Sequence, residues 1–142
     1  ANLTFVDSTL SNNAAGTSGG AMFLDETTRT PGDVIVQIID TQIFGNSAQY
    51  GGAIWMDSVE VTCTGSTAGS AGIWGNTAGY YGGGVRMWNT EGTVFTSSIC
   101  DFGVSGSADD NDPNDVQVYR GDEYADYNDN ESFTCTSLGG CR

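Results

Sequence analysis

A two-part motif recurs in this chain at a nearly constant interval. Each copy contains a pair of glycines followed by an apolar step, and consecutive pairs begin 32 residues apart, at positions 19, 51 and 83. An apolar-x-Asn-x-Ala element precedes each pair. A fixed period of about 20 to 50 residues is typical of solenoids, whose repeats bury their apolar faces only against their neighbours. The repeated positions are Asn12, Asn46 and Asn76 with Gly19, Gly20, Gly51, Gly52, Gly83 and Gly84.

Each repeat has the same internal order. A β-branched run comes first, then the Asn element, then the glycine pair and a short apolar strand; no segment shows a capped, amphipathic helical period. The sequence therefore predicts an all-β protein, a right-handed parallel β-helix of about four rungs. The predicted repeats occupy residues 1–104, and residues 105–142 are predicted to form an acidic, disulfide-containing C-terminal cap. The expected strands are 3–6, 34–39 and 59–62 in the first set, and 21–24, 53–56 and 85–88 in the second.

The repeated polar positions have a physical role in such a stack. An inward asparagine at one corner of every rung can hydrogen-bond to its own copies and to the turn backbone. Glycine pairs permit a tight bend and a close approach of backbones that a Cβ atom would prevent. We therefore expect an asparagine ladder and a glycine corner running along the stack.

Composition limits the function classes. The chain has 142 residues, enough for one domain with its own core, and 18 acidic residues against 4 arginines, with no lysine and no histidine. A net charge of −14 repels nucleic acid and anionic membranes, so neither is an expected partner. No stretch approaches the roughly 20 apolar residues of a membrane helix, so no membrane insertion is expected. Because the chain opens on Ala1, the sequence predicts a processed chain or a piece of a longer one.

The four cysteines show no C-x-x-C spacing and have no histidine partners, which argues against zinc. Their even number predicts two disulfides and a secreted, extracellular or cell-surface protein. Of the three connectivities, we favour Cys135–Cys141 as a small C-terminal loop and Cys63–Cys100 between neighbouring turns. The alternative is a set of free buried thiols.

The segments Ile43-Phe44-Gly45-Asn46-Ser47-Ala48 and Gly51-Gly52-Ala53-Ile54 resemble the paired F-x-x-N and G-G-A-[ILV] repeats of polymorphic outer-membrane proteins. They are also similar to the wider class of β-helix repeat proteins related to the pectate-lyase fold. The resemblance covers about residues 3–104 and departs at the third glycine step, which ends in Val85-Arg86. It implies a surface or passenger β-helix used in adhesion, and it carries over no catalytic residues.

The segment from 109 to 131 holds nine of the acidic residues. The spacing Asp110-x-Asp112-x-Asn114 matches the first, third and fifth positions of a calcium loop, but the sixth and twelfth positions lack the glycine and glutamate of an EF-hand. Two interpretations stay open: a calcium site, which would be the only cofactor, or a solvated acidic loop. The candidate ligands are Asp109, Asp110, Asp112, Asn114 and Asp115.

Two further groups of residues are candidates for a site. Asp25, Asp40 and Asp57 are the carboxylates near strand ends that a glycosidase would need, but acids are sparse on the rungs; no enzyme is expected, and Arg86 is interpreted as an outward, solubilising residue. The tryptophans Trp55, Trp74 and Trp88 form either a sugar-stacking or packing surface, or ordinary core and corner filling.

These patterns leave several functions open. The leading expectation is an extracellular structural or adhesive module that stacks end to end on itself into filaments, or binds a surface glycan or protein. The alternative is a carbohydrate-binding or polysaccharide-degrading β-helix. Ice binding is a further candidate, although the threonines form no regular T-x-T ladder.

Overall fold

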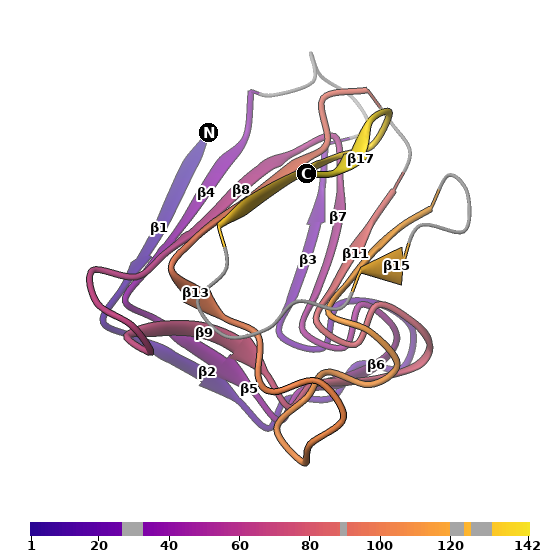
Figure 1. Cartoon of the computed structure of the whole chain (residues 1–142). Helices are drawn as coiled ribbons and strands as arrows, with labels where there is room; N and C mark the ends of the chain where they lie inside the picture. The colour runs from indigo at the N-terminus through magenta and orange to yellow at the C-terminus, as the bar shows by residue number, and fades with distance from the viewer. Residues whose placement is uncertain (27–32, 89–90, 120–123, 126–131) are drawn as a thin grey trace.

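The chain folds into a β-solenoid of about four turns in a computed structural model that describes residues 1–26, 33–88, 91–119, 124–125 and 132–142. The described residues form strands, turns and bridges but no helix, and the strands of successive turns pair in parallel. Figure 1 shows the successive turns stacked on one another, with the strands of each sheet side by side. The predicted all-β fold class and the stacked parallel strands are confirmed.

The largest sheet, sheet A, starts every turn. Its residues alternate between buried and more exposed, as a strand with one covered face requires. The first four strands are parallel and the last two antiparallel. In spatial order they are β1 (Asn2–Val6), β4 (Ile35–Ile39), β8 (Glu60–Thr64), β12 (Val94–Ser98), β16 (Phe133–Thr136) and β17 (Gly140–Cys141).

Three smaller sheets complete the solenoid, and the two strands of sheet C belong to the second and third turns. Sheet B contains β2 (Thr9–Ser11), β5 (Gln42–Phe44), β9 (Ala71–Trp74) and β13 (Cys100–Asp101), and sheet C contains β6 (Ser47–Tyr50) and β10 (Thr77–Tyr81). Sheet D contains β3 (Met22–Asp25), β7 (Ile54–Asp57), β11 (Val85–Met87), β14 (Val116–Val118) and the antiparallel β15 (Tyr124–Ala125).

The core lies inside the stack and consists of columns of equivalent residues. Ile54, Val85 and Val116 occupy one position of three neighbouring strands in sheet D, and all three are at most 1% exposed. Columns of this kind supply each turn with the same narrow set of inward apolar side chains, which a single turn could not bury alone.

The asparagine ladder exists, but its members differ from the predicted ones at both ends. Asn46 Oδ1 accepts hydrogen bonds from the backbone N and Nδ2 of Asn13, at 2.9 and 3.0 Å, and Asn76 and Asn111 repeat the arrangement in the next two turns. The prediction of Asn12 is therefore wrong by one residue. Asn12 instead sits at φ 56°, at the corner where the next two turns place glycine, because asparagine tolerates the left-handed region better than most residues.

The glycine corner also shifts by one residue in the third turn. Tyr50 and Tyr81 are register partners, so the glycines that follow them, Gly51 at φ 64° and Gly82 at φ 66°, are equivalent. The third pair is thus Gly82-Gly83 and not the predicted Gly83-Gly84. Gly84 stands where Ala53 stands in the second turn, because both precede paired residues of sheet D.

The stack continues beyond the boundary predicted at residue 104. β14 pairs in parallel with β11, and Asn111 completes the ladder, so the fourth turn extends to Val118. The predicted cap begins only after this turn. There β16 runs antiparallel to β12, and the Phe133 ring lies 6.0 Å from Phe95 over the end of the core.

Both favoured disulfides are present. Cys63 on β8 is bonded to Cys100 on β13, so this bridge joins the third turn to the fourth. Cys135 and Cys141 close the C-terminal hairpin of β16 and β17. No free cysteine remains among the described residues. Two disulfides are compatible with an oxidising, extracellular environment.

Replacing Asn76, in the buried centre of the asparagine ladder, should lower the stability of the protein. Asn76 is fully buried, and its Nδ2 donates to the carbonyls of Ile43 and Trp74, each at 3.0 Å, in addition to its ladder bonds. We expect Asn76→Ala to lower the free energy of unfolding by about 3 kcal/mol, because it leaves buried donors and acceptors unsatisfied. Urea unfolding followed by circular dichroism measures the change.

Asn13→Ala provides the matched control, because Asn13 is exposed at the end of the same ladder. Its loss should cost no more than about 1 kcal/mol. Equal costs for the two variants would show that the ladder does not stabilise the stack through its buried hydrogen bonds.

Candidate functional site

The outward face of sheet D carries a row of aromatic side chains whose rings contact one another. Strand alternation places Met22, Ile54 and Val85 inward, so the next residue in each strand, Phe23, Trp55 or Arg86, points outward. Trp88 and Tyr119 lie two residues beyond Arg86 and Gln117 on the same outward side, and their backbone N–H groups bond to Met56 and Met87 of the preceding turns. The outward face is thus a stripe of rings that crosses all four turns.

The stripe changes column between the second and third turns. Arg86 occupies the position equivalent to Trp55, and Trp88 follows at the position equivalent to Asp57. This sideways step separates the rings into two pairs. Phe23 and Trp55 stack at 4.5 Å with an interplanar angle of 5°, and Trp88 and Tyr119 stack at 4.0 Å and 25°.

Between the two pairs the stack is open. The Trp55 and Trp88 centroids are 6.1 Å apart and their planes are tilted by 41°. Rings in close parallel contact cover each other's faces, whereas a wedge leaves part of both faces available to another molecule. The step in the stripe therefore creates an aromatic opening at the junction of the second and third turns.

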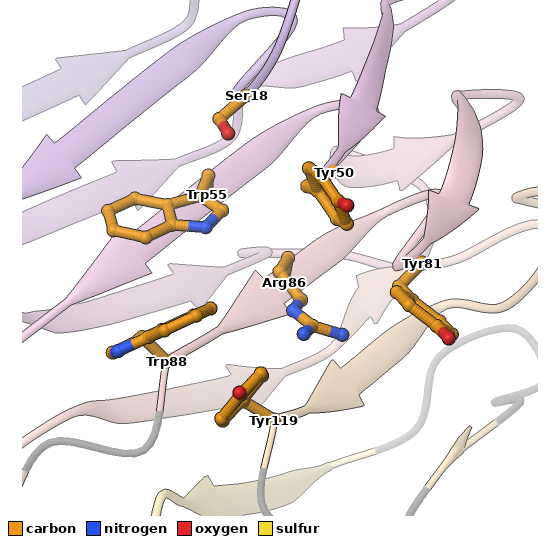
Figure 2. A pocket seen from close by; sticks show the side chains of 7 residues that line it. All are labelled: Ser18, Tyr50, Trp55, Tyr81, Arg86, Trp88 and Tyr119. Carbon is orange, nitrogen blue, oxygen red and sulfur yellow. The ribbon is translucent and has the colours of Figure 1, made fainter.

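This opening belongs to a groove with a cavity volume of about 480 Å³, which is within the usual range of small-molecule sites. Figure 2 shows Arg86 in the middle, the two tryptophans on one side, and the tyrosines of sheet C on the other. We call it the aromatic groove; its lining residues are Ser18, Tyr50, Trp55, Tyr81, Arg86, Trp88 and Tyr119.

Arg86 forms the floor of the aromatic groove and is 3% exposed. Its Cζ atom lies 4.9 Å from the centroid of the Tyr81 ring, 5.1 Å from Tyr119 and 5.9 Å from Tyr50. At these distances the negative faces of the rings attract the guanidinium. The predicted outward position of Arg86 is correct. The predicted solubilising role is wrong, because aromatic rings cover the side chain.

Trp74 lies elsewhere, on sheet B. Its ring stacks on Phe44 at 4.5 Å, and its Nε1 donates to Gln42 Oε1 at 2.8 Å. It borders a smaller cavity of about 330 Å³ with Gln42, Gly69, Asp101 and Asp109. The three tryptophans therefore do not form one platform: Trp55 and Trp88 share the aromatic groove, and Trp74 does not.

The three candidate carboxylates also do not form one cluster. Asp25 and Asp57 are register partners on the outward side of sheet D, and Asp57 is 5% exposed and accepts a hydrogen bond from the Ser58 hydroxyl. Asp40 lies at the corner after β4, where hydrogen bonds from the Ser66 backbone and the Ser70 hydroxyl hold its pKa below the usual value. None of the three lines the aromatic groove.

The candidate calcium ligands belong mainly to the corner of the fourth turn. Asn114 Oδ1 accepts a hydrogen bond from the Gly82 backbone at 3.0 Å, and Asp115 Oδ1 accepts one from Asn111 Nδ2 at 2.7 Å. Asp110 Oδ2 accepts the Gly106 N–H, the Asp112 backbone pairs with Asn76, and hydrogen bonding from Ser107 lowers the pKa of Asp109.

In the part of the chain that the structure describes, no three His, Cys, Asp or Glu side chains gather as a metal site would require. Calcium binding stays a prediction. The other acidic residues of the segment, Asp122, Glu123, Asp126, Asp129 and Glu131, lie outside the described residues.

The fold and the aromatic groove define the chain as a β-solenoid with a concave, ring-lined site on one outward face. Comparison with models of protein families, with curated proteins and with solved structures gave no match. Among the described residues, no helix is long and apolar enough to span a membrane.

Proposed function

We propose that this chain is an extracellular carbohydrate-binding β-solenoid and that the aromatic groove holds the sugar. Carbohydrates present apolar C–H faces edged by hydroxyl groups. The groove offers both kinds of partner: the tilted faces of Trp55 and Trp88, and around them the polar groups of Ser18, Tyr50 and Arg86. The observation that supports the proposal most directly is the position of Trp88, which lies one outward position beyond the column of Trp55. Because of this shift the rings of Trp55 and Trp88 are tilted and do not stack face to face.

The rigidity of the scaffold supports this role. Tyr50, Trp55, Tyr81 and Arg86 lie on strands that neighbouring turns hold in register, and Tyr50 and Tyr81 are themselves register partners. Trp88 and Tyr119 follow directly after β11 and β14, where their backbone N–H groups bond to the carbonyls of Met56 and Met87. A preformed site binds without first having to order its side chains, which is a large part of the usual cost of binding. The two disulfides support an extracellular setting.

Trp88→Ala should weaken glycan binding by about 30-fold, corresponding to about 2 kcal/mol, because it removes one wall of the opening. The measurement is a glycan array with the purified chain, followed by calorimetry on the best-retained glycan. Trp74→Ala is the matched control, since Trp74 is also a partly buried, stacked ring but lies on sheet B.

The control should change the affinity by less than about two-fold. Equal losses in the two variants, or an array on which no glycan is retained, would contradict the proposed function.

Assembly into filaments stays a prediction with a geometric requirement. Head-to-tail stacking that continues the parallel sheets needs a parallel edge at both ends of the solenoid. At the C-terminal end, sheets A and D carry the antiparallel strands β16 and β15. Such stacking would have to displace or bypass these strands, so the aromatic groove is the better-supported basis for a function.

A further inference from the structure

We propose that the smaller cavity, on the outward side of sheet B, binds a primary alkyl ammonium group. The charge of the ligand lies between Asp101 and Asp109, and its methylene groups pack on the Trp74 ring. This inference goes beyond the proposed function, because the cavity shares no lining residue with the aromatic groove. We call it the Trp74 cavity; it has a volume of about 330 Å³ and is lined by Gln42, Gly69, Trp74, Asp101 and Asp109.

The outward ring column of sheet B ends at Trp74. Trp74 and Phe44 are register partners whose rings stack at 4.5 Å, so Phe44 covers the ring face on the side of the second turn. On the other side, the Gly75 N–H donates to the Asp109 carbonyl at 2.8 Å, as the Asn12 N–H does to the carbonyl of Phe44. Asp109 therefore takes the fourth-turn position that follows Phe44 and Trp74. The column continues with a carboxylate and not with a third ring, which leaves a ring face of the kind that attracts an organic cation.

The Trp74 ring is fixed in place by its neighbours. Its Nε1 donates to Gln42 Oε1 at 2.8 Å, and Gln42 Nε2 donates in turn to the Gly69 carbonyl at 2.8 Å. The outward position of β9 beside the ring is Gly72, where a Cβ atom would lie 2.8 Å from Trp74 Cδ1. The missing side chain thus lets the indole lie close against its own strand. A wall that is already ordered lowers the cost of binding a small ligand.

Two carboxylates line the Trp74 cavity, and neither pairs with an arginine in the part of the chain that the structure describes. Asp101 Oδ1 accepts the Gly103 N–H at 2.8 Å, and Asp109 Oδ1 accepts a hydrogen bond from the Ser107 hydroxyl. Each carboxylate therefore keeps its second oxygen, Oδ2, for a ligand. The hydrogen bond from Ser107 also holds the pKa of Asp109 below its usual value, so this group is charged at neutral pH. At long range, the net charge of −14 attracts cations to the molecule.

These groups suit an alkyl ammonium better than a metal ion or a guanidinium. Calcium prefers roughly six to eight oxygen ligands, but the described cavity offers two carboxylates and two amide oxygens, of Gln42 and Gly69, that already accept hydrogen bonds. A ring face contributes nothing to a metal ion, whereas it attracts an organic cation and packs against methylene groups. The three N–H donors of an ammonium can reach two separate carboxylates, while the planar guanidinium fork matches a single one.

The test titrates n-butylammonium chloride into the ¹⁵N-labelled full chain and follows the three indole N–H resonances. We expect the Trp74 signal to shift along a saturation curve while the signals of Trp55 and Trp88 stay in place. 1-Butanol, a neutral probe of similar size, and calcium chloride should each bind about ten-fold more weakly or less. The affinity for butylammonium should fall as the salt concentration rises, because salt screens the attraction between ammonium and carboxylate.

Asp101→Asn and Asp109→Asn each remove one charge and keep the Oδ1 acceptor that the neighbouring backbone or hydroxyl group uses. Each variant should weaken butylammonium binding about five-fold or more. Glu60→Gln is the matched control, since it removes the same charge from β8 in sheet A, and it should change the affinity by less than about two-fold. Circular dichroism and thermal unfolding verify that all three variants are folded.

Equal affinity for butylammonium and 1-butanol would overturn the ammonium site, because the carboxylates would then contribute nothing. Tighter binding of calcium would also overturn it and would identify a metal site. Nα-acetyl-lysine N-methylamide and 1,4-diaminobutane, tested in the same way, distinguish an amine presented by a peptide from a free polyamine, and binding of either supports the site. None of these results bears on the proposed sugar site, which is reported by Trp55 and Trp88 and not by Trp74.

Discussion

Gly52→Ala is expected to lower the free energy of unfolding by about 4 kcal/mol or more, enough to unfold a large fraction of a marginally stable domain. A Cβ atom at this position would lie 2.6 Å from the Thr77 carbonyl oxygen and still closer to that of Gly83. Both neighbours are backbone atoms of the next turn, so no side chain can rotate away to relieve the contact. Thermal and urea unfolding of the purified variant measure the loss.

Gly16→Ala is the control for this experiment. A Cβ atom at Gly16 would meet nothing within 4 Å, so the substitution should be neutral or stabilise the protein by up to about 1 kcal/mol. A folded Gly52→Ala variant with the stability of the parent would show that the turns are not packed as closely at this corner as the structure has them.

Removing the disulfide between turns should have a comparable effect. Cys63 and Cys100 are separated by 37 residues, and the chain-entropy model assigns about 4 kcal/mol to closing such a loop. The double variant Cys63→Ala with Cys100→Ala should lose this amount, measured by urea unfolding under oxidising conditions. Both sulfur atoms are buried in the core, so imperfect repacking would add to the loss.

The second disulfide supplies an internal comparison. Cys135 and Cys141 are only 6 residues apart, for which the same model gives about 2 kcal/mol. The corresponding double variant should therefore lose about half as much stability. If the hairpin bridge proved the more stabilising of the two, the cap rather than the stacked turns would be the main determinant of stability.

The repeat predicts the solenoid because its physical requirement is visible in the residues. A turn that contains one inward asparagine, one glycine corner and two short apolar strands has no way to bury itself except by stacking. The pairing of Cys135 with Cys141 can also be predicted from the sequence, since a separation of 6 residues suits a hairpin. The fold class therefore follows from the pattern without any coordinates.

The exact register does not follow, because the turns differ in length. Successive ladder residues, Asn13, Asn46, Asn76 and Asn111, are 33, 30 and 35 residues apart, so no constant period connects them. Asn12 and Asn13 are adjacent, and Gly82 to Gly84 form an unbroken run, so counting alone cannot choose between neighbours. In the fourth turn, Asn111 lies in an acidic run that lacks the glycine pair.

The aromatic groove was the least predictable part of the molecule. The sequence indicates Trp55 and Trp88 as candidates only in a set with Trp74, and it gives no indication that Tyr119 joins them. Its placement beside Trp88 depends on the pairing of β14 with β11 across 31 residues, and β14 lies beyond residue 104, where the predicted repeats end. The sequence signal for the aromatic groove is the outward column of sheet D, in which Phe23 and Trp55 are followed by Arg86 in the third turn.

The central claim is that sugars bind at the aromatic groove, and the three indole N–H resonances of the chain test it in a single measurement. A ¹H–¹⁵N spectrum should be recorded while the glycan that is best retained on the array is titrated into the ¹⁵N-labelled protein, with the resonances assigned from single Trp→Phe variants. The structure predicts that the signals of Trp55 and Trp88 shift together with one saturation curve while that of Trp74 stays in place. A titration in which Trp74 alone shifts, or in which all three indoles remain unmoved while the glycan binds, would contradict the claim.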